Sequence, residues 1–310
     1  GMVLCVVMIL VANMLVSFQP FVLAKIINLI QAANINDTNA ALPPLKWAAM
    51  YGALIIAFWI LHGPARVIER KTAFHILENS TNALYKKVTE MPLKWHQDHH
   101  SGDTINRINK ASHSLFNFAQ NEFVIVQMAV RFCMAMILLG TYSLGVLAAS
   151  LTVSVVVAVI IRQFDKVLVP LIKQTNDGEH RLSATLFDYI SNIITIVTLR
   201  VQSHTRDGVT HRLDTMRPVF WRSFLLNEYK WASVDMSLTL VQTGIVSGYI
   251  AIHLLQHQPM EIGAVVAIFQ YLLMIKNVFY DGAQVYSVLM HRSADLHSVD
   301  DLNADHARLA

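Results

Sequence analysis

The sequence predicts an all-α membrane protein with six long transmembrane helices, and two observations support this fold class. The chain of 310 residues is 54% hydrophobic and only 15% charged, whereas a soluble domain carries about 25% charged residues. In addition, six apolar runs recur along the chain, most of them near the ~20 residues that a helix needs to cross a bilayer. Both cysteines, Cys5 and Cys133, lie inside such runs. We therefore expect buried apolar thiols rather than a disulfide framework.

The predicted spans are justified in turn by their apolar runs. They cover residues at about 2–30, 45–64, 112–139, 144–163, 228–255 and 262–286. The run in the second span, WAAMYGALIIAFWIL, is the weakest, but its helical pattern continues beyond the apolar stretch.

The distribution of basic residues predicts which connections face the cytoplasm. Residues 64–113 hold eight of the 24 Lys and Arg, and residues 162–230 hold ten. The connection 31–46 holds only Lys46, and 140–143 and 256–261 hold none. Because basic loops stay on the cytoplasmic side, both long connections and both termini are expected there. We expect a multi-pass integral protein of a bacterial inner (cell) membrane.

The long connections are themselves predicted to be helical. Apolar residues recur at helical spacing in 65–91, 104–122 and 163–199. A helix from Thr104 to Leu139 would be roughly 54 Å long, whereas the hydrocarbon core is only about 30 Å thick. The helices should therefore run out of the bilayer. The resulting cytoplasmic extensions are 65–111, 164–227 and 287–310, within a single domain that covers 1–310.

A polar stretch, WHQDHHSGDTINRINK (95–110), marks the turn between an outgoing and a returning helix. Pro92 can end the outgoing helix, and WHQDHHS can form one or two turns of a short transverse helix. Gly102 suits a C′ position with positive φ. Asp103 or Thr104 can then cap the returning helix. Such a polar tip is typical of a surface that contacts another soluble body.

The order of these features resembles the membrane domain of a type I (type IV in the newer naming) ABC exporter. The tip reads Ser-Gly-Asp-Thr-Ile-Asn-Arg-Ile over 101–108, similar to the pattern [ST]-G-[DE]-x-x-x-R-[ILV] that follows the first coupling helix in that family. The family pattern usually continues with an Asp where this chain has Lys110. The stretch DYISNIITIVTLR (188–200) resembles the approach to the second coupling helix, expected at about 198–207. Residues 260–263 resemble the outer turn that opens the sixth span.

This resemblance implies an ATP-driven exporter in which the chain forms the substrate pathway and the coupling helices. It also implies a domain-swapped dimer, with itself or with a homologous chain, in which spans four and five reach across to the partner. The residues expected to couple to the ATPase domain are His96, Gln97, Asp98, His99, His100, Ser101, Gly102, Asp103, Arg107, Arg200, Gln202 and His204.

The ATP-hydrolysing motifs are not found in this sequence. It contains neither G-x-x-x-x-G-K-[ST], which cradles phosphates, nor an LSGGQ-like signature. We therefore expect no catalytic residue and no cofactor on this chain. ATP and Mg²⁺ would act through nucleotide-binding domains, either in a further part of the same protein or on a separate chain.

Ionisable residues within the predicted spans indicate a candidate substrate cavity. Arg131 lies midway in the third span and Lys276 in the sixth, and charges at such depth are costly unless they face a cavity or pathway. With Met128 and Phe269 they would favour an amphipathic or anionic substrate. The alternatives are that Lys276 pairs locally with Asp281 and that the apolar side chains pack against lipid.

Two other functions remain open at this point. A channel or secondary transporter that does not use ATP should show an inverted repeat or broken helices at the midplane. A metal-sensing receptor could use HQDHH, because His96 and His100 are spaced i, i+4 on one helix face. The transported substrate is not predicted.

Overall fold

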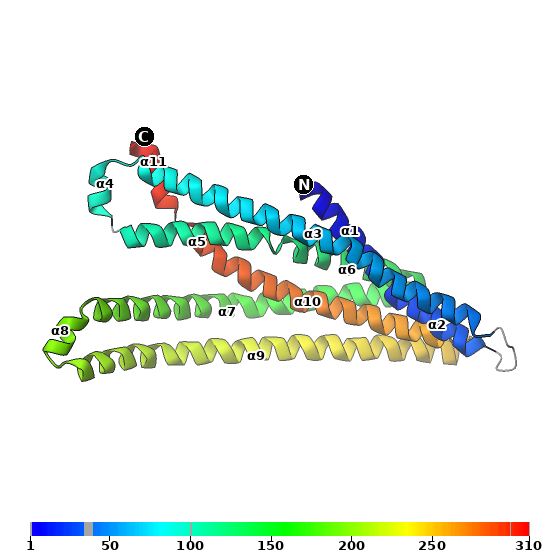
Figure 1. Ribbon diagram of the computed structural model, residues 1–310. Helices are drawn as coiled ribbons and strands as arrows, with labels where there is room; N and C mark the ends of the chain where they lie inside the picture. The colour runs from blue at the N-terminus through cyan, green and yellow to red at the C-terminus, as the bar shows by residue number, and fades with distance from the viewer. Residues whose placement is uncertain (1, 34–39, 100, 298, 310) are drawn as a thin grey trace. The chain divides into compact units, whose positions relative to one another are not determined.

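The computed structural model describes residues 2–33, 40–99, 101–297 and 299–309, and every regular element in them is helical (Figure 1). The helices are α1 (Met2–Ser17), α2 (Gln19–Ala32), α3 (Leu42–Thr89), α4 (Leu93–Asp98), α5 (Ser101–Ala119), α6 (Glu122–Tyr142), α7 (Leu144–Ser191), α8 (Ile193–Thr198), α9 (Gln202–Leu255), α10 (Ile262–His297) and α11 (Asp300–Leu309). The predicted all-α fold is confirmed.

Six helical stretches of the described chain are long and apolar enough to cross a membrane, as predicted. They are Met2–Ala32, Leu42–Thr89, Thr104–Tyr142, Leu144–Ser191, Gln202–Leu255 and Ile262–Ala283. The helices α3 and α7 contain 48 residues each and α9 contains 54. At 1.5 Å per residue they are roughly 70–80 Å long, more than twice the ~30 Å of a hydrocarbon core. They therefore extend well beyond the lipid.

The chain divides into two compact units, residues 1–147 with 246–310, and residues 148–245. The second unit consists of α7 and α9 side by side, joined by α8 (Figure 1). Lys230 on α9 donates to Asp165 on α7 across 3.1 Å. Closer to α8, the side chain of Met216 on α9 packs against Gly178 on α7. A Cβ at residue 178 would lie only 2.8 Å from the Met216 side chain. These contacts join α7 and α9 at two levels along the unit.

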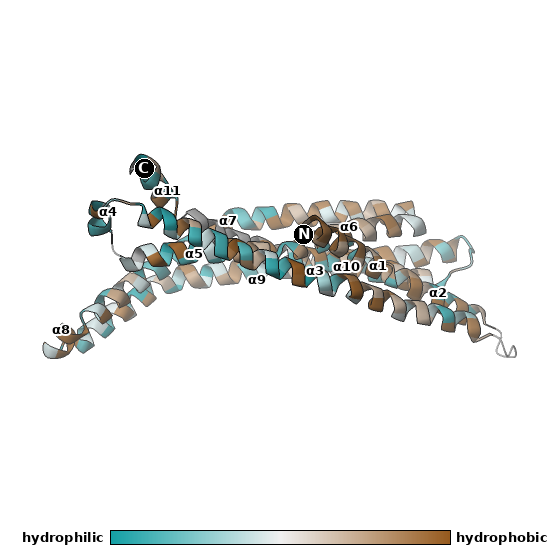
Figure 2. Cartoon of the chain, turned by 45° about the horizontal axis from the view of Figure 1, so that its top comes forward, coloured by the Kyte–Doolittle hydropathy of each residue, from teal (hydrophilic) through white to brown (hydrophobic). Residues whose placement is uncertain are grey.

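In the first unit, α1 packs against α3 and α6, and α10 packs against α2, α5 and α6. The most deeply buried large side chains here include Ile9, Leu139, Ile268 and Tyr271. Figure 2 shows α1 coloured largely as apolar, whereas α4 carries hydrophilic colour. Cys5 is buried as expected, but Cys133 is exposed on α6. The expectation for Cys133 was wrong, because Cys133 lies with Ile137 on the exposed stripe of α6, whereas Met134 and Ala135 are buried.

The outer ends of α2 and α10 are joined by side-chain caps. The first backbone N–H groups of a helix have no partner within it. Here Asn28 Oδ1 accepts from Gly263 N at 2.7 Å, and Gln31 Oε1 accepts from Ile262 N at 3.2 Å. Asn28 Nδ2 also donates to Glu261 at 2.6 Å. A Cβ at Gly263 would overlap the carbonyl oxygen of Ala24, so only glycine permits this approach.

Two predicted spans are interrupted. The first breaks at Phe18, and Pro20, which has no N–H to donate, follows at the start of α2. The third was expected to be one helix from Thr104 to Leu139, and this was wrong, because α5 ends at Ala119 and α6 begins at Glu122. Asn121 Nδ2 bonds the Asn117 carbonyl at 2.7 Å. Such local side-chain bonds compete with helical hydrogen bonding.

Candidate coupling tips and membrane pathway

The first tip, here named tip 1 (residues 90–108), is a reversal built around the short helix α4. Pro92 is extended (φ −61°, ψ 152°) and precedes α4, and His99 is extended (φ −121°, ψ 129°) and follows it. A short helix is present, as predicted, but it covers Leu93–Asp98 rather than the predicted 95–101. Its predicted termination was wrong, because α5 already begins at Ser101. Gly102 lies inside α5, and no described glycine has positive φ. Asp103 and Thr104 therefore lie within the first turn of α5 rather than before it.

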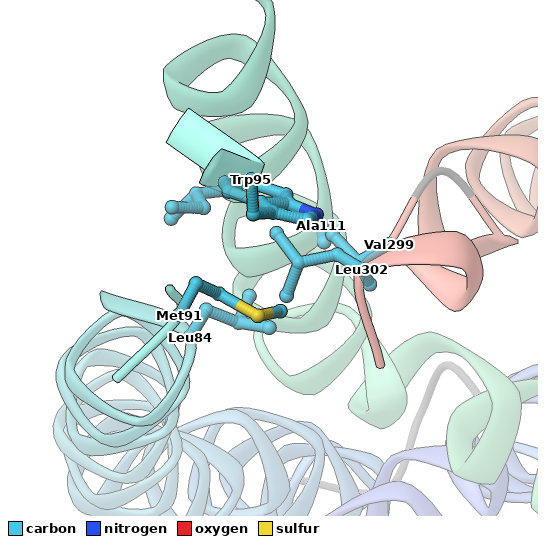
Figure 3. Packing of buried hydrophobic residues seen from close by; sticks show 7 residues of the cluster. Leu84, Met91, Trp95, Ala111, Val299 and Leu302 are labelled. Carbon is cyan, nitrogen blue, oxygen red and sulfur yellow. The ribbon is translucent and has the colours of Figure 1, made fainter. Parts of the chain in front are cut away.

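Trp95 holds α4 against the neighbouring helices of tip 1. Its side chain is buried, 8% exposed, in an apolar cluster viewed in Figure 3. The cluster consists of Leu84, Met91, Trp95, Ile108, Ala111, Val299 and Leu302. The imidazole of His99 stacks on the indole with ring centroids 4.2 Å apart, and its Nδ1 lies 2.9 Å from the Trp95 carbonyl. Burying one aromatic side chain in this way fixes the orientation of a helix of only six residues.

The helix α11 completes tip 1, which the sequence analysis missed. Trp95 Nε1 donates to Asp305 Oδ2 at 3.1 Å, and Lys87 Nζ donates to Asn303 Oδ1 at 2.7 Å. His306 Nε2 lies 3.2 Å from Glu90 Oε2. The signal available in the sequence was the apolar pair Val299 and Leu302 at helical spacing. The segment 287–310, which was predicted only as an extension, thus ends in a helix bound to the tip.

Most of the predicted coupling residues of tip 1 form its outer surface. His96, Gln97, Asp98, His99, Ser101 and Gly102 are exposed, and Arg107 is half-buried. His100 and the side chain of Asp103 lie outside the described residues. Among the side chains that are described, no three His, Cys, Asp or Glu are placed to hold a metal ion. The alternative metal pair of His96 and His100 includes one residue that is not described.

The second tip, here named tip 2 (residues 187–204), differs from its predicted position. The short helix is α8, Ile193–Thr198, and not 198–207. It ends because Arg200 adopts a left-handed conformation (φ 55°), and Val201 N bonds Ile196 O at 3.1 Å while Arg200 N bonds Val197 O at 3.2 Å. This is a Schellman cap in which arginine occupies the position usually held by glycine. No glycine in the sequence marks this position.

The surface of tip 2 is more apolar than that of tip 1. The predicted residues Arg200, Gln202 and His204 are exposed, with Gln202 at the start of α9. Beside them, Ile194 and Leu199 are 80% and 66% exposed. Exposed aliphatic side chains at the end of long helices indicate a site covered by another protein.

The residues predicted to line a substrate cavity lie in two places, one between α6 and α10 and the other along one face of α10. Arg131 on α6 lies near enough to Asp281 on α10 for their charges to attract. One turn away, the Met128 methyl group packs against Gly282. Phe269 and Lys276 lie seven residues apart on one face of α10, with Phe269 47% exposed. The charge of Asp281 thus acts on Arg131, and its pairing with Lys276 stays a prediction.

Comparison with known proteins agrees with this architecture. Curated relatives include proteins named beta-(1→2)glucan export ATP-binding/permease protein NdvA from Brucella abortus, Brucella suis and Brucella melitensis. Each is 25% identical over 213 residues, which are 66% of this chain and 32% of the relative. The chain thus spans about a third of the length of the curated relatives it matches.

The family comparison covers much more of the chain. Residues 2–278 match the family described as the ABC transporter transmembrane region. The match includes the first five candidate spans, most of the sixth, and residues 90–108 and 187–204 of the two tips. The sequence resemblance noted above is confirmed by this match. The chain belongs to the ABC transporter transmembrane region family.

Proposed function

We propose that this chain is the membrane-spanning part of an ATP-driven exporter whose tips receive motion from nucleotide-binding domains. The observation that carries the proposal is the pair of short helices, α4 and α8, at the ends of helices of 48 and 54 residues. Helices of that length present the tips roughly 20 Å or more beyond the lipid. Their exposed surfaces are free to meet an ATPase domain in the cytoplasm.

Transmission through tip 1 follows from how α4 is held. Trp95 and the side chains around it tie α4 to α3, α5 and α11. A push on the exposed residues of α4 therefore moves these helices together, as a rigid body. ATP and Mg²⁺ are held by the partner domains, and the chain supplies no group to the chemistry of hydrolysis.

The compact α7–α9 unit supports the proposal of a dimer in which spans four and five reach toward a partner. Residues 148–245 cluster with one another rather than with the remainder of the chain. The partner is a second copy or a homologous chain, and its nucleotide-binding domain would meet tip 2. The inner membrane of a bacterium is the proposed location, with both termini in the cytoplasm.

The proposed pathway lies along α6 and α10. The Phe269–Lys276 face of α10 offers an aromatic ring and an amine to an amphipathic or anionic substrate. The attraction between the charges of Arg131 and Asp281 and the packing of Met128 against Gly282 keep α6 beside α10. A β-(1→2)glucan is the first compound to test, because the curated relatives are named as its exporters. Its sugar rings present apolar faces to aromatic side chains.

The test is ATPase activity that copurifies with the tagged chain from its native membranes. Vanadate-sensitive hydrolysis is expected with the wild type and with the exposed outer variant Gln256→Ala. It should fall at least tenfold with the triple tip variant His96→Ala/Gln97→Ala/Asp98→Ala. If hydrolysis is absent from the wild type or survives unchanged in the triple tip variant, the ATP-driven function is wrong. A channel or secondary transporter then becomes the better hypothesis.

A further inference from the structure

The break between α5 and α6 brings two helix ends face to face. The last carbonyls of α5 and the first N–H groups of α6 lack partners within their own helices. The end of α5 is negative and the start of α6 is positive, because peptide dipoles add along a helix. Asn121, which precedes α6, makes no side-chain hydrogen bond that caps α6. Groups from elsewhere must therefore satisfy part of this junction.

Two residues of α3 fill the junction with charges of the complementary signs. Arg66 Nη1 donates to the Gln120 carbonyl at 3.0 Å, so a cation meets the end of α5. Glu69 Oε1 accepts from Phe123 N at 3.0 Å, so an anion meets the start of α6. The other carboxylate oxygen of Glu69 accepts from Arg66 Nη1. One ion pair thus caps both helices.

The surroundings of the pair are largely apolar. Glu69 is 7% exposed, and the guanidinium of Arg66 lies 3.6 Å from the centre of the Phe123 ring. A small core from α1, α3 and α6 lies beside it, made of Cys5, Met8, Ile9, Ala65, Ile68, Phe123 and Val126. In apolar surroundings, removing Arg66 or Glu69 alone leaves the other charge buried and unpaired, whereas removing both charges is often tolerated.

We propose that Arg66 and Glu69 are positioning residues that brace the broken third span and carry motion of tip 1 into its membrane half. The proposal rests on the function proposed above. An unbroken helix would carry such motion by itself, but the α-helix is interrupted at residues 120 and 121, where only a few backbone hydrogen bonds join α5 to α6. The helix α3 is continuous from Leu42 to Thr89 and touches both sides of the junction. Through the ion pair, α3 fixes the angle between α5 and α6.

The brace can be tested on the chain alone by measuring the distance between two spin labels. The labels replace the exposed residues Asn109 on α5 and Ile137 on α6, in a Cys5→Ser/Cys133→Ser background. They lie roughly 40 Å apart along the helix axes. We expect one narrow distance distribution for the intact pair. Arg66→Met and Glu69→Leu should each widen it at least twofold.

The double variant Arg66→Met/Glu69→Leu is the decisive sample, because it leaves no unpaired buried charge and should fold. It still deprives Gln120 O and Phe123 N of their partners, so the wide distribution should persist. The matched control is His75→Gln/Glu78→Gln, an exposed pair at the same i, i+3 spacing on α3, which should leave the distribution unchanged. A double variant as narrow as the wild type would overturn the brace.

A second measurement separates this inference from the proposed function. In transporter purified with its ATPase partner, the double variant should retain ATP hydrolysis. The amount of β-(1→2)glucan moved per ATP hydrolysed should fall at least tenfold. Retention of that ratio would overturn the role in transmission. If no ATPase copurifies even with the wild type, the proposed function fails, and the label distances still decide whether Arg66 and Glu69 set the angle.

Discussion

Trp95 Nε1 and Asp305 Oδ2 lie 3.1 Å apart although 210 positions separate the two residues in the chain. This hydrogen bond joins α4, the short helix of tip 1, to α11, which follows the sixth span. Tip 1 is therefore composed of the first hairpin and the segment after the last candidate span together. Movement of either part is expected to displace the other.

Removing the indole should release α11. Trp95→Phe keeps an aromatic ring but loses the N–H donor, which costs about 1 kcal/mol, while Trp95→Ala also opens a cavity and costs about 3–5 kcal/mol. Hydrogen exchange of residues 299–309 should accelerate in that order. Leu93→Ala, at a position 75% exposed on the same short helix, should leave exchange unchanged. Equal exchange in all three variants would mean that α11 is held by other contacts.

A methyl group at residue 263 should separate the outer ends of α2 and α10. In Gly263→Ala the new Cβ would collide with the Ala24 carbonyl oxygen and displace the Asn28 cap. Overpacking of this kind costs about 1–3 kcal/mol. The apparent melting temperature in detergent should fall. Gly52→Ala is the control, because no atom lies within 4 Å of its Cβ position and alanine favours a helix by about 0.5–1 kcal/mol. A stable Gly263→Ala protein would contradict the close approach.

Arg200 has both a left-handed backbone and a charged side chain, and two substitutions test these two features separately. Glycine adopts φ 55° without the cost of about 1–2 kcal/mol that an L-residue incurs there. Arg200→Gly should therefore match or exceed the wild type in thermal stability. If the guanidinium contacts the ATPase domain, ATPase association should nevertheless weaken. Arg200→Ala removes the guanidinium but keeps the backbone cost, so it should weaken ATPase association without gaining stability. An Arg200→Gly protein that is less stable than Arg200→Ala would contradict the Schellman cap.

The buried ion pair of the α7–α9 unit should be far more sensitive than an exposed one. Side chains of Lys230 and Asp165 are 9% and 21% exposed, and breaking a buried pair by removing one partner costs about 3–5 kcal/mol. Lys230→Met should lower the apparent melting temperature strongly, and Lys230→Met/Asp165→Leu should recover most of it. In the exposed pair Arg217–Asp214, Arg217→Met should change stability by less than about 1 kcal/mol. Similar effects at both sites would argue against burial as the cause.

The sequence by itself determined the class of the protein and the order of its parts. Six apolar runs set the six spans, because a helix needs about 20 apolar residues to cross lipid. Helical periodicity beyond those runs predicted rods longer than the bilayer, and the polar stretch 95–103 predicted the short helix at the end of the first hairpin. Each of these follows from the spacing and polarity of residues close together in the chain.

Only the tertiary structure decided how the breaks and ends are completed. The third span is broken at 120–121 because Arg66 and Glu69, over 50 positions earlier, supply the missing hydrogen bonds. Trp95 is an anchor because α11 returns to it, and α8 ends at Thr198 because an arginine accepts a left-handed backbone. These outcomes depend on partners that are distant in sequence or on the free energy of the whole folded chain. A buried polar group is satisfied by whichever neighbour the fold brings to it, and local sequence does not specify that neighbour.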